Sequence, residues 1–406
     1  MKNQKMLFIL ITMFLNFLGF SIIIPILPFL IGQYVHTANM IALYVGLLLS
    51  VYAFCQFFAS PGLGALSDRF GRRPILLVSL FGSVVGYLFL GIGGALWILF
   101  LGRIIDGLTG GNISTIFAYV ADITEPKDRG KYYGMLGAAG GFGFMIGPAL
   151  GGVLAHINLS TPMFVAAGVT LVNMVWGWAV LPESLPVHHK IEKVDIAHLN
   201  PFSQFSHVFT LRILRKLFLS GFIFFFAMNA MYGNASVYLK DVFGWNVTQI
   251  GLLLFSVGIL DIITQGFLVR KLLPIFGEAK LTGAGLVLCA VGFGVGSLTA
   301  IYTVPLLLFV GVILLNVGDG LFEPSMSSLI SGAVGPKMQG RVQGANQGMQ
   351  SVARVVGPLF SSWAYQYWHG LPYAGEAVIT FIALGILALS YPTIHSHIVS
   401  QNNQTA

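Results

Sequence analysis

The residues of this chain that could do chemistry are charged side chains set inside long apolar stretches. Asp319 and Glu323 are four residues apart, and Arg103 and Asp106 are three apart. On a helix, both spacings place the two side chains on one face. An ionised side chain at the centre of a membrane helix costs about 2.5–3.5 kcal/mol. We therefore expect these residues to face a cavity or one another, and to mark a functional site.

Asp319 and Glu323 are the leading candidates for proton chemistry. Two carboxylates on one helix face, away from bulk water, cannot both ionise cheaply. A carboxyl group that binds and releases a proton near neutral pH is what proton coupling requires. Because Glu323 precedes Pro324, a structural acid near a helix end is the alternative that the sequence leaves open.

A polar stripe follows on the next apolar segment. Its members are Gln343, Gln347, Gln350 and Arg354. At roughly 100° per residue they fall within a stripe about 60° wide on a helix. We expect the stripe to line water and to bring Arg354 toward the two acids.

Other polar residues at membrane depth are expected to line a substrate cavity. They are Asn16, Asn112, Asn229, Tyr232 and Asn234. Arg103 and Asp106 either neutralise each other or take part in proton coupling, and their spacing leaves both interpretations open. Asp261 is a weaker candidate.

The composition shows what surrounds these residues. The chain is 56% hydrophobic and 9% charged, with a mean hydropathy of +0.83. Soluble proteins carry about 25% charged residues, so the lipid bilayer must act as the solvent here. Cys55 and Cys289 both lie in apolar runs, which disfavours a disulfide framework or a thiol–metal site. The sequence predicts an all-α membrane protein with twelve transmembrane helices. We expect them near residues 6–31, 41–66, 75–93, 96–121, 131–155, 162–181, 213–239, 247–268, 280–300, 303–331, 341–367 and 374–394.

The basic residues orient the helices. Most of the 21 Lys and Arg residues fall in alternate loops, whereas the opposite loops hold Lys240. By the positive-inside rule, both termini are expected in the cytoplasm. The net charge of +7 is explained by this distribution, so nucleic acid is not an expected partner.

The chain also repeats itself. Residues 126–134 and 336–344 both read P-K-x-x-G-[KR]-x-x-G, and Gly-Pro recurs at the same offset at 147–148 and 357–358. We therefore predict two pseudo-symmetric six-helix bundles, 1–181 and 213–406, joined by a cytoplasmic linker, 182–212. Two such parallel repeats can rock about a central site and expose it to alternate sides of the membrane. The chain has no phosphate-binding loop to suggest ATP hydrolysis.

Residues 64–74 read G-A-L-S-D-R-F-G-R-R-P, which resembles the signature G-x-L-[ST]-D-R-x-G-R-R of the major facilitator superfamily. Two further motifs make the chain similar to the bacterial drug:proton antiporter branch of this superfamily, the tetracycline and multidrug efflux proteins. Residues 99–107 are similar to the arginine-bearing motif of proton-coupled members, and residues 137–152 to the glycine-proline motif of drug antiporters.

The resemblance implies roles for several residues. A conformational gate is implied for Asp68, Arg69, Gly71, Arg72, Arg73 and Asp122. The helix-5 motif comprises Gly143, Gly147, Pro148 and Gly151, where missing side chains allow close helix packing. Proton coupling is predicted for Asp319, Glu323, Asp106, Arg103 and Arg354. Asn16 and Gly86 stand where tetracycline pumps carry intramembrane acids, which favours drugs in general over the tetracycline–metal chelate.

These observations predict an antiporter that imports protons and exports small amphipathic compounds by alternating access. We expect a monomer in the bacterial plasma membrane, with no enzymatic activity, cofactor or metal. A proton-coupled nutrient or sugar importer of the same superfamily is one alternative. A non-transporting membrane receptor is another.

Overall fold

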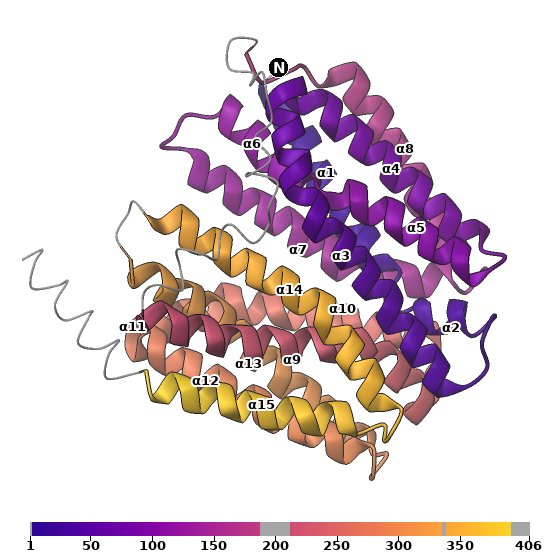
Figure 1. Cartoon of the computed structure of the whole chain (residues 1–406), viewed down its shortest axis with the longest axis vertical. Helices are drawn as coiled ribbons and strands as arrows, with labels where there is room; N and C mark the ends of the chain where they lie inside the picture. Colours follow the sequence, from indigo (N-terminus) through magenta and orange to yellow (C-terminus); the bar gives the residue numbers. More distant parts are fainter. Residues whose placement is uncertain (1, 187–211, 335–337, 391–406) are drawn as a thin grey trace, which may run out of the picture. The chain divides into compact units, whose positions relative to one another are not determined.

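The computed structural model describes residues 2–186, 212–334 and 338–390, and the regular structure in these ranges is helical (Figure 1). Ten helices or helix runs among the described residues are long and apolar enough to cross a membrane. Most of the predicted linker, residues 187–211, lies outside the described residues, as does the start of the second repeat motif, Pro336 and Lys337.

The first group of helices runs from the N-terminus to residue 180. It comprises α1 (Lys2–Ile22), α2 (Leu27–Ile31), α3 (Ala38–Phe70), α4 (Arg72–Ile92), α5 (Leu96–Thr109), α6 (Ile113–Ile123), α7 (Arg129–Leu154) and α8 (Thr161–Val180). The later group comprises α9 (Arg212–Phe243), α10 (Val247–Ile263), α11 (Arg270–Phe276), α12 (Glu278–Thr299), α13 (Pro305–Gly332), α14 (Gln339–Tyr365) and α15 (Leu371–Ala388).

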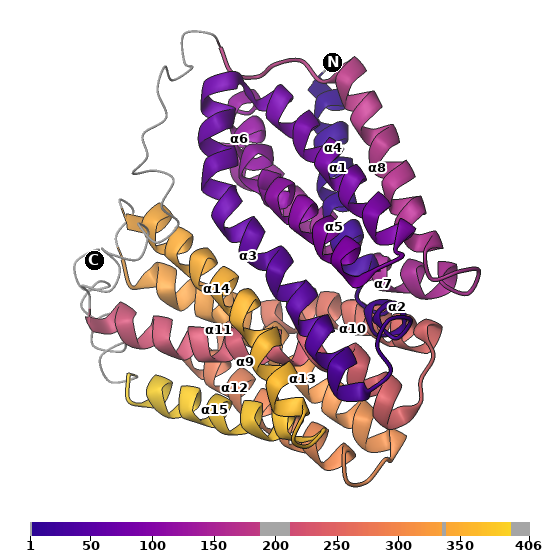
Figure 2. The same cartoon turned by 45° about the vertical axis from the view of Figure 1, so that its right-hand side comes forward.

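The described helices form two compact units (Figure 2). Unit 1 contains α1 to α8 together with Leu239–Gly258, which is the end of α9 and most of α10. Unit 2 contains the rest of α9 and the helices from the end of α10 onward.

Two predicted helices are interrupted. One continuous helix over 96–121 is wrong, because a 3-10 turn, η1 (Gly110–Asn112), separates α5 from α6. Glycine weakens a helix, and a Cβ on Gly111 would lie 2.9 Å from the Cα of Ser60, so α3 packs against bare backbone there. The prediction of one helix over 6–31 is wrong for a related reason. Pro25 and Pro28 remove backbone donors where α1 gives way to α2.

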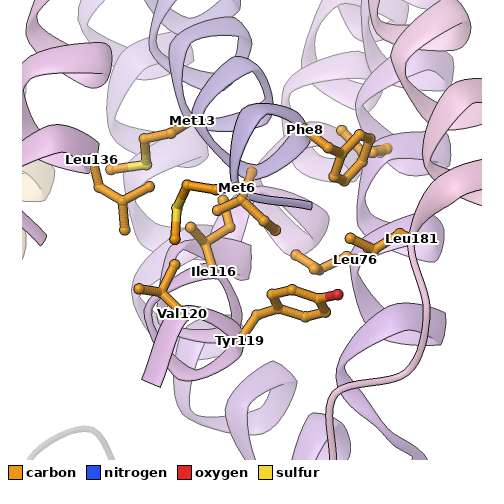
Figure 3. Packing of buried hydrophobic residues seen from close by; sticks show 11 residues of the cluster. Met6, Phe8, Met13, Leu76, Ile116, Tyr119, Val120, Leu136 and Leu181 are labelled. Atoms are coloured by element: carbon orange, nitrogen blue, oxygen red, sulfur yellow. The ribbon is translucent and has the colours of Figure 1, made fainter. Parts of the chain in front are cut away.

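The core of unit 1 lies between helices far apart in sequence. Met6 and Phe8 of α1 pack with Leu76 of α4, Ile116 of α6 and Leu136 of α7 (Figure 3). All five side chains are buried. This packing holds α1, α4 and α6 together and so fixes the polar residues that these helices carry.

Unit 2 is organised around α12, which packs against both α13 and α15. A smaller apolar cluster joins Val269, Leu281 and Leu321. Val269 ends η5 (Thr264–Val269), a π-helical segment between α10 and α11 that contacts α13. A π-helical turn shifts the side chains that precede it relative to those that follow, and such turns often occur at functional sites.

Candidate functional site

The two predicted acids lie in the middle of α13. Asp319 and Glu323 are one turn apart and partly buried. The helix continues through Pro324 to Gly332, so Glu323 is not near a helix end. Since proline lacks an N–H, the carbonyl of Gly320 has no α-helical donor at position 324. The acids therefore lie beside a backbone carbonyl that accepts no α-helical hydrogen bond.

Asp261 at the end of α10 joins these acids. A Cβ on Gly320 would lie 3.5 Å from Asp261 Oδ1 and 2.7 Å from Thr264 Cγ2, so the glycine lets the two helices meet. Gln265 Nε2 donates a hydrogen bond to Asp261 Oδ1 at 2.8 Å. Asp261 and Glu323 both act electrostatically on Asp319. We call Asp261, Asp319 and Glu323 the acid cluster.

Two further side chains face the acid cluster. The hydroxyl of Tyr232 on α9 lies in the electrostatic field of all three acids. Arg354 on α14 acts electrostatically on Glu323. Within the described residues, no three His, Cys, Asp or Glu side chains are arranged to hold a metal ion.

The polar stripe of α14 is accessible, in contrast to the faces beside it. Gln347 and Arg354 are exposed, whereas Ala345 and Ala353 are completely buried. Gln343 Nε2 donates to Ser327 Oγ at 3.4 Å, which ties the stripe to α13.

The predicted cavity residues of α9 do not form one group. Asn229 is partly exposed, and its Nδ2 donates to Phe225 O at 2.7 Å. Asn234 is 1% exposed, and neither its Nδ2 nor its Oδ1 has a hydrogen-bond partner in the described part of the chain. It therefore lies inside unit 2.

Unit 1 holds the buried pair of α5. Arg103 is 0% exposed, and its Nη1 lies 3.7 Å from Asp106 Oδ2. The guanidinium carbon lies 4.7 Å from the ring centroid of Tyr52, a cation–π contact. Ser83 provides a hydrogen bond to Asp106, and a Cβ on Gly86 would lie 2.7 Å from Asp106 Cβ. The glycine that stands in place of a second acid thus makes room for Asp106.

Asn16 and Asn112, predicted on separate helices, meet in unit 1. Asn16 Nδ2 donates to Asn112 Oδ1 at 2.9 Å. Asn112 ends the η1 turn, so the break between α5 and α6 brings its amide to α1. Its own Nδ2 is buried and has no partner among the described residues. The pair provides an uncharged hydrogen-bonding site.

The glycines of α7 pack on α1. A Cβ on Gly147 would lie 2.8 Å from Leu18 O, and one on Gly143 or Gly151 would overlap the backbone of α1. On another face, Thr248 Oγ1 of α10 donates to Gly152 O at 2.9 Å. Small residues let membrane helices approach this closely, so α7 is clamped between two helices within unit 1.

The predicted gate residues are centred on Arg72. Its guanidinium pairs with Asp68 and, at 3.3 Å, with Asp122 Oδ2. Ser184 Oγ donates to Asp122 Oδ2 at 2.8 Å. The network thus joins the end of α3 and the start of α4 to the end of α6. Arg69 instead lies over the Phe70 ring, at 5.1 Å from its centroid.

Glu183 completes this network and was not predicted. Its carboxylate accepts hydrogen bonds from the backbone N–H groups of Arg72, at 2.9 Å, and Arg73, at 3.3 Å. These groups start α4, where a negative charge is favoured by the helix dipole. Gly71, with φ +113°, forms the sharp turn. The available signal was an acid directly after the apolar segment 162–181.

The sequence profile of the Major Facilitator Superfamily matches residues 9–290 and 217–405. The tetracycline resistance protein, class C, of Escherichia coli is 34% identical over 392 residues, covering 95% of this chain and 97% of the relative. Multidrug resistance protein 1 of Bacillus subtilis is 29% identical, covering 95% of each chain. The predicted resemblance to this family and its drug-efflux branch is confirmed.

Solved structures show the same fold. A bacterial homologue of the human lysosomal transporter Spinster has a TM-score of 0.78 at 14% identity, covering 98% of each chain. The human organic anion transporter MFSD10 has a TM-score of 0.72 at 23% identity, covering 95% of this chain and 99% of its own. These relatives are transporters, not enzymes.

Proposed function

Because this chain belongs to the Major Facilitator Superfamily, and so is a multi-pass membrane transporter of small molecules, we propose that it is a proton-driven antiporter. In this proposal it exports small amphipathic organic compounds and imports protons by alternating access. The observation that carries the proposal is the acid cluster, in which Asp261, Asp319 and Glu323 meet on two membrane helices beside Arg354.

The acid cluster suits proton binding because of its charge. Three carboxyl groups face one guanidinium, so full ionisation would leave excess negative charge in a membrane unit. Each ionised group at a helix centre costs about 2.5–3.5 kcal/mol. A proton on one carboxyl removes such a charge and leaves an O–H donor for its neighbours. Tyr232 provides a further hydroxyl at the same place.

The driving force is sufficient for export. Each proton moved across the membrane gains about 2.3 kcal/mol per 100 mV. That energy sustains a concentration ratio of roughly 50-fold for a neutral substrate, because about 1.4 kcal/mol corresponds to a factor of ten. A pH difference adds to this ratio.

The topology that we propose has twelve spans. Ten are long and apolar enough on their own. The interrupted run of α5 and α6 would supply one more, and α14, whose glutamines lower its hydropathy, another. The spans then form two halves, 1–181 and 213–406, with 182–212 as a cytoplasmic linker and both termini in the cytoplasm of a bacterial cell. The transporter works as a monomer.

The substrate contacts proposed in unit 1 are neutral. Asn16 and Asn112 offer hydrogen bonds without a charge, and Gly86 leaves no second acid beside Asp106. In unit 2, the accessible stripe of Gln343, Gln347 and Gln350 offers further amides. A relative that confers tetracycline resistance supports drug export, whereas these neutral positions favour a broader set of amphipathic compounds.

The decisive experiment uses everted membrane vesicles, where export appears as uptake. We expect Asp319→Asn or Glu323→Gln to abolish uptake driven by a pH gradient, while binding of a fluorescent amphipathic dye stays measurable. The matched control is Glu125→Gln, which removes an exposed carboxyl paired with Lys127. Wild-type uptake rates in both cluster variants would refute proton coupling at this site.

A further inference from the structure

Glu376 is a buried acid outside the acid cluster. It lies on the second turn of α15 and is 0% exposed. Neither Oε1 nor Oε2 has a hydrogen-bond partner in the described part of the chain. No charged side chain acts on it there, and burial is its dominant environment. An ionised carboxylate in such a place is far less stable than a neutral acid.

Three tyrosines lie in the neighbourhood of Glu376, near the ends of α12 and α14 and the start of α15. The rings of Tyr238 on α9 and Tyr373 on α15 are 4.8 Å apart. The Tyr238 hydroxyl lies 2.7 Å from Thr299 Oγ1, near the end of α12. Tyr365 of α14 and Glu376 both act electrostatically on Tyr373. Phenol groups from three helices therefore surround this end of unit 2.

One turn closer to the middle of unit 2, the same helices carry buried polar groups. Asn234 precedes Tyr238 by one turn, and Ser361 precedes Tyr365 by one turn, so each shares a face with its tyrosine. Both are buried, and the Asn234 amide and Ser361 Oγ have no hydrogen-bond partner in the described ranges. A Cβ on Gly375 would lie 3.9 Å from the Phe360 ring, which brings this part of α15 against α14.

The Glu376 carboxyl has neither a cation that would hold it ionised nor a hydrogen bond that would hold it neutral in the described part of the chain. Its neutral form offers an O–H donor and its ionised form only acceptors, so gain or loss of a proton changes how it can bond to nearby hydroxyl groups.

The position of Glu376 relates it to the acid cluster. The backbone of α12 at Gly296 packs on Tyr373. Cys289 Sγ, two turns earlier on α12, packs against Gly318, next to Asp319. Two turns of helix rise about 11 Å. Glu376 lies one turn from Tyr373 in the direction of the cluster, so it stands between the helix ends and the three acids along the axis of unit 2.

We propose that Glu376 is a second proton-binding carboxyl of the transport cycle, separate from the acid cluster. The proposal rests on the proposed proton-driven export, in whose topology the tyrosine end of unit 2 faces the outside, from which protons enter. A proton adds to one carboxylate oxygen of Glu376 and leaves from it, with no other bond changed. Among the described residues, the titratable groups near it are Tyr238, Tyr365 and Tyr373, with His369 stacked on Tyr365 at 4.6 Å between ring centroids.

Everted vesicles carrying the full chain test this proposal. Glu376→Gln keeps the shape of the neutral acid but cannot exchange a proton. We expect it to lower uptake driven by a pH gradient by roughly tenfold or more, the effect of losing one coupled proton. Exchange of labelled dye for unlabelled dye, which needs no net proton movement, should stay close to wild type. Wild-type pH-driven uptake would overturn the proposal and leave Glu376 as a static neutral acid.

A labelling experiment on the wild-type protein decides the case in which Glu376→Gln does not fold. Dicyclohexylcarbodiimide, an apolar reagent, modifies protonated carboxyl groups in apolar surroundings. Mass spectrometry should detect the adduct on Glu376 after reaction at acidic pH. The yield of the adduct should fall as the pH of the reaction is raised. Labelling of Glu376 that is independent of pH, or absent, would overturn the proposal. Vesicles with wild-type or Glu125→Gln protein distinguish the role of Glu376 from the proposed function. If pH-driven uptake fails in these vesicles too, the proposed proton-driven export itself is refuted.

Discussion

Replacing Gly71 with alanine should destabilise unit 1 through two effects at one residue. Gly71 has φ +113° and ψ 157°, a region of backbone space that is essentially restricted to glycine. The added Cβ would also overlap the Glu183 carboxylate, which accepts the first N–H groups of α4. The variant therefore strains the turn and displaces the group that caps the helix.

The size of the loss follows from these two effects. A non-glycine residue in this backbone region costs about 1–3 kcal/mol. A carboxylate at a helix N-terminus contributes roughly 0.3–1 kcal/mol at an exposed position, and Glu183 is exposed. We expect Gly71→Ala to cost about 1–4 kcal/mol in total.

Thermal unfolding of the purified protein in detergent measures this loss. The matched control is Gly62→Ala on α3, whose Cβ would have no atom within 4 Å. Its melting temperature should match or exceed that of the wild type, since alanine favours helix. A double-mutant cycle with Glu183→Ala separates the two effects. Because both single variants remove the same cap, the double variant should lose less than the sum of the two losses.

Two results would refute this reasoning. Equal melting temperatures for Gly71→Ala and Gly62→Ala would mean that the turn is not strained. Additive losses in the cycle would mean that Gly71 and Glu183 act independently, and that the carboxylate is not held by the start of α4.

Two further predictions concern α7 and α1. Gly147→Val should lower the melting temperature, by an overpacking cost of about 1–3 kcal/mol, because its side chain would meet Ser21 and the Leu18 carbonyl. Gly141→Val, with no atom within 4 Å of its Cβ, is the control and should melt like the wild type. Asn16→Asp should favour a monocationic dye over a neutral one by roughly fivefold in vesicle uptake, since opposite charges about 4 Å apart in water attract by about 1 kcal/mol. An unchanged ratio would exclude Asn16 from the substrate path.

The sequence predicted which helix faces carry polar groups. Asp319 and Glu323 at i and i+4, the α14 stripe, and the glycines of α7 all depend on helical spacing alone, and their helices exist where expected. Asn16 and Asn112 were assigned to one cavity because both are amides at membrane depth, and they form a hydrogen bond. Spacing within a helix is local information, so a single sequence is enough to reveal it.

Contacts that depend on interruptions were not predictable in this way. The η1 turn brings Asn112 to α1, and the η5 segment, which follows Asp261, contacts α13. Neither departure from the α-helix follows from a hydrophobic pattern. Glu376 lies inside the expected helix 374–394 but was not singled out, because its burial depends on neighbouring helices and not on its own spacing. Glu183 was assigned to the linker, and its contacts with the start of α4 join parts of the chain that are far apart in sequence.

The charge balance of each unit explains why protons and substrate would compete. In unit 1, Arg103 lies beside Asp106, so the pair carries no excess charge when both side chains are ionised. In unit 2, the three carboxylates of the acid cluster face Arg354, so the ionised set carries two excess negative charges. At about 2.5–3.5 kcal/mol for each charge, this form is too costly to persist across a transport cycle, and it is relieved by a proton or by the positive end of an amphipathic compound. Whichever binds first lowers the excess negative charge from two to one and so weakens the attraction for the other. This exclusion is the thermodynamic requirement for exchange, and we infer that the acid cluster meets it through its excess of carboxyl groups.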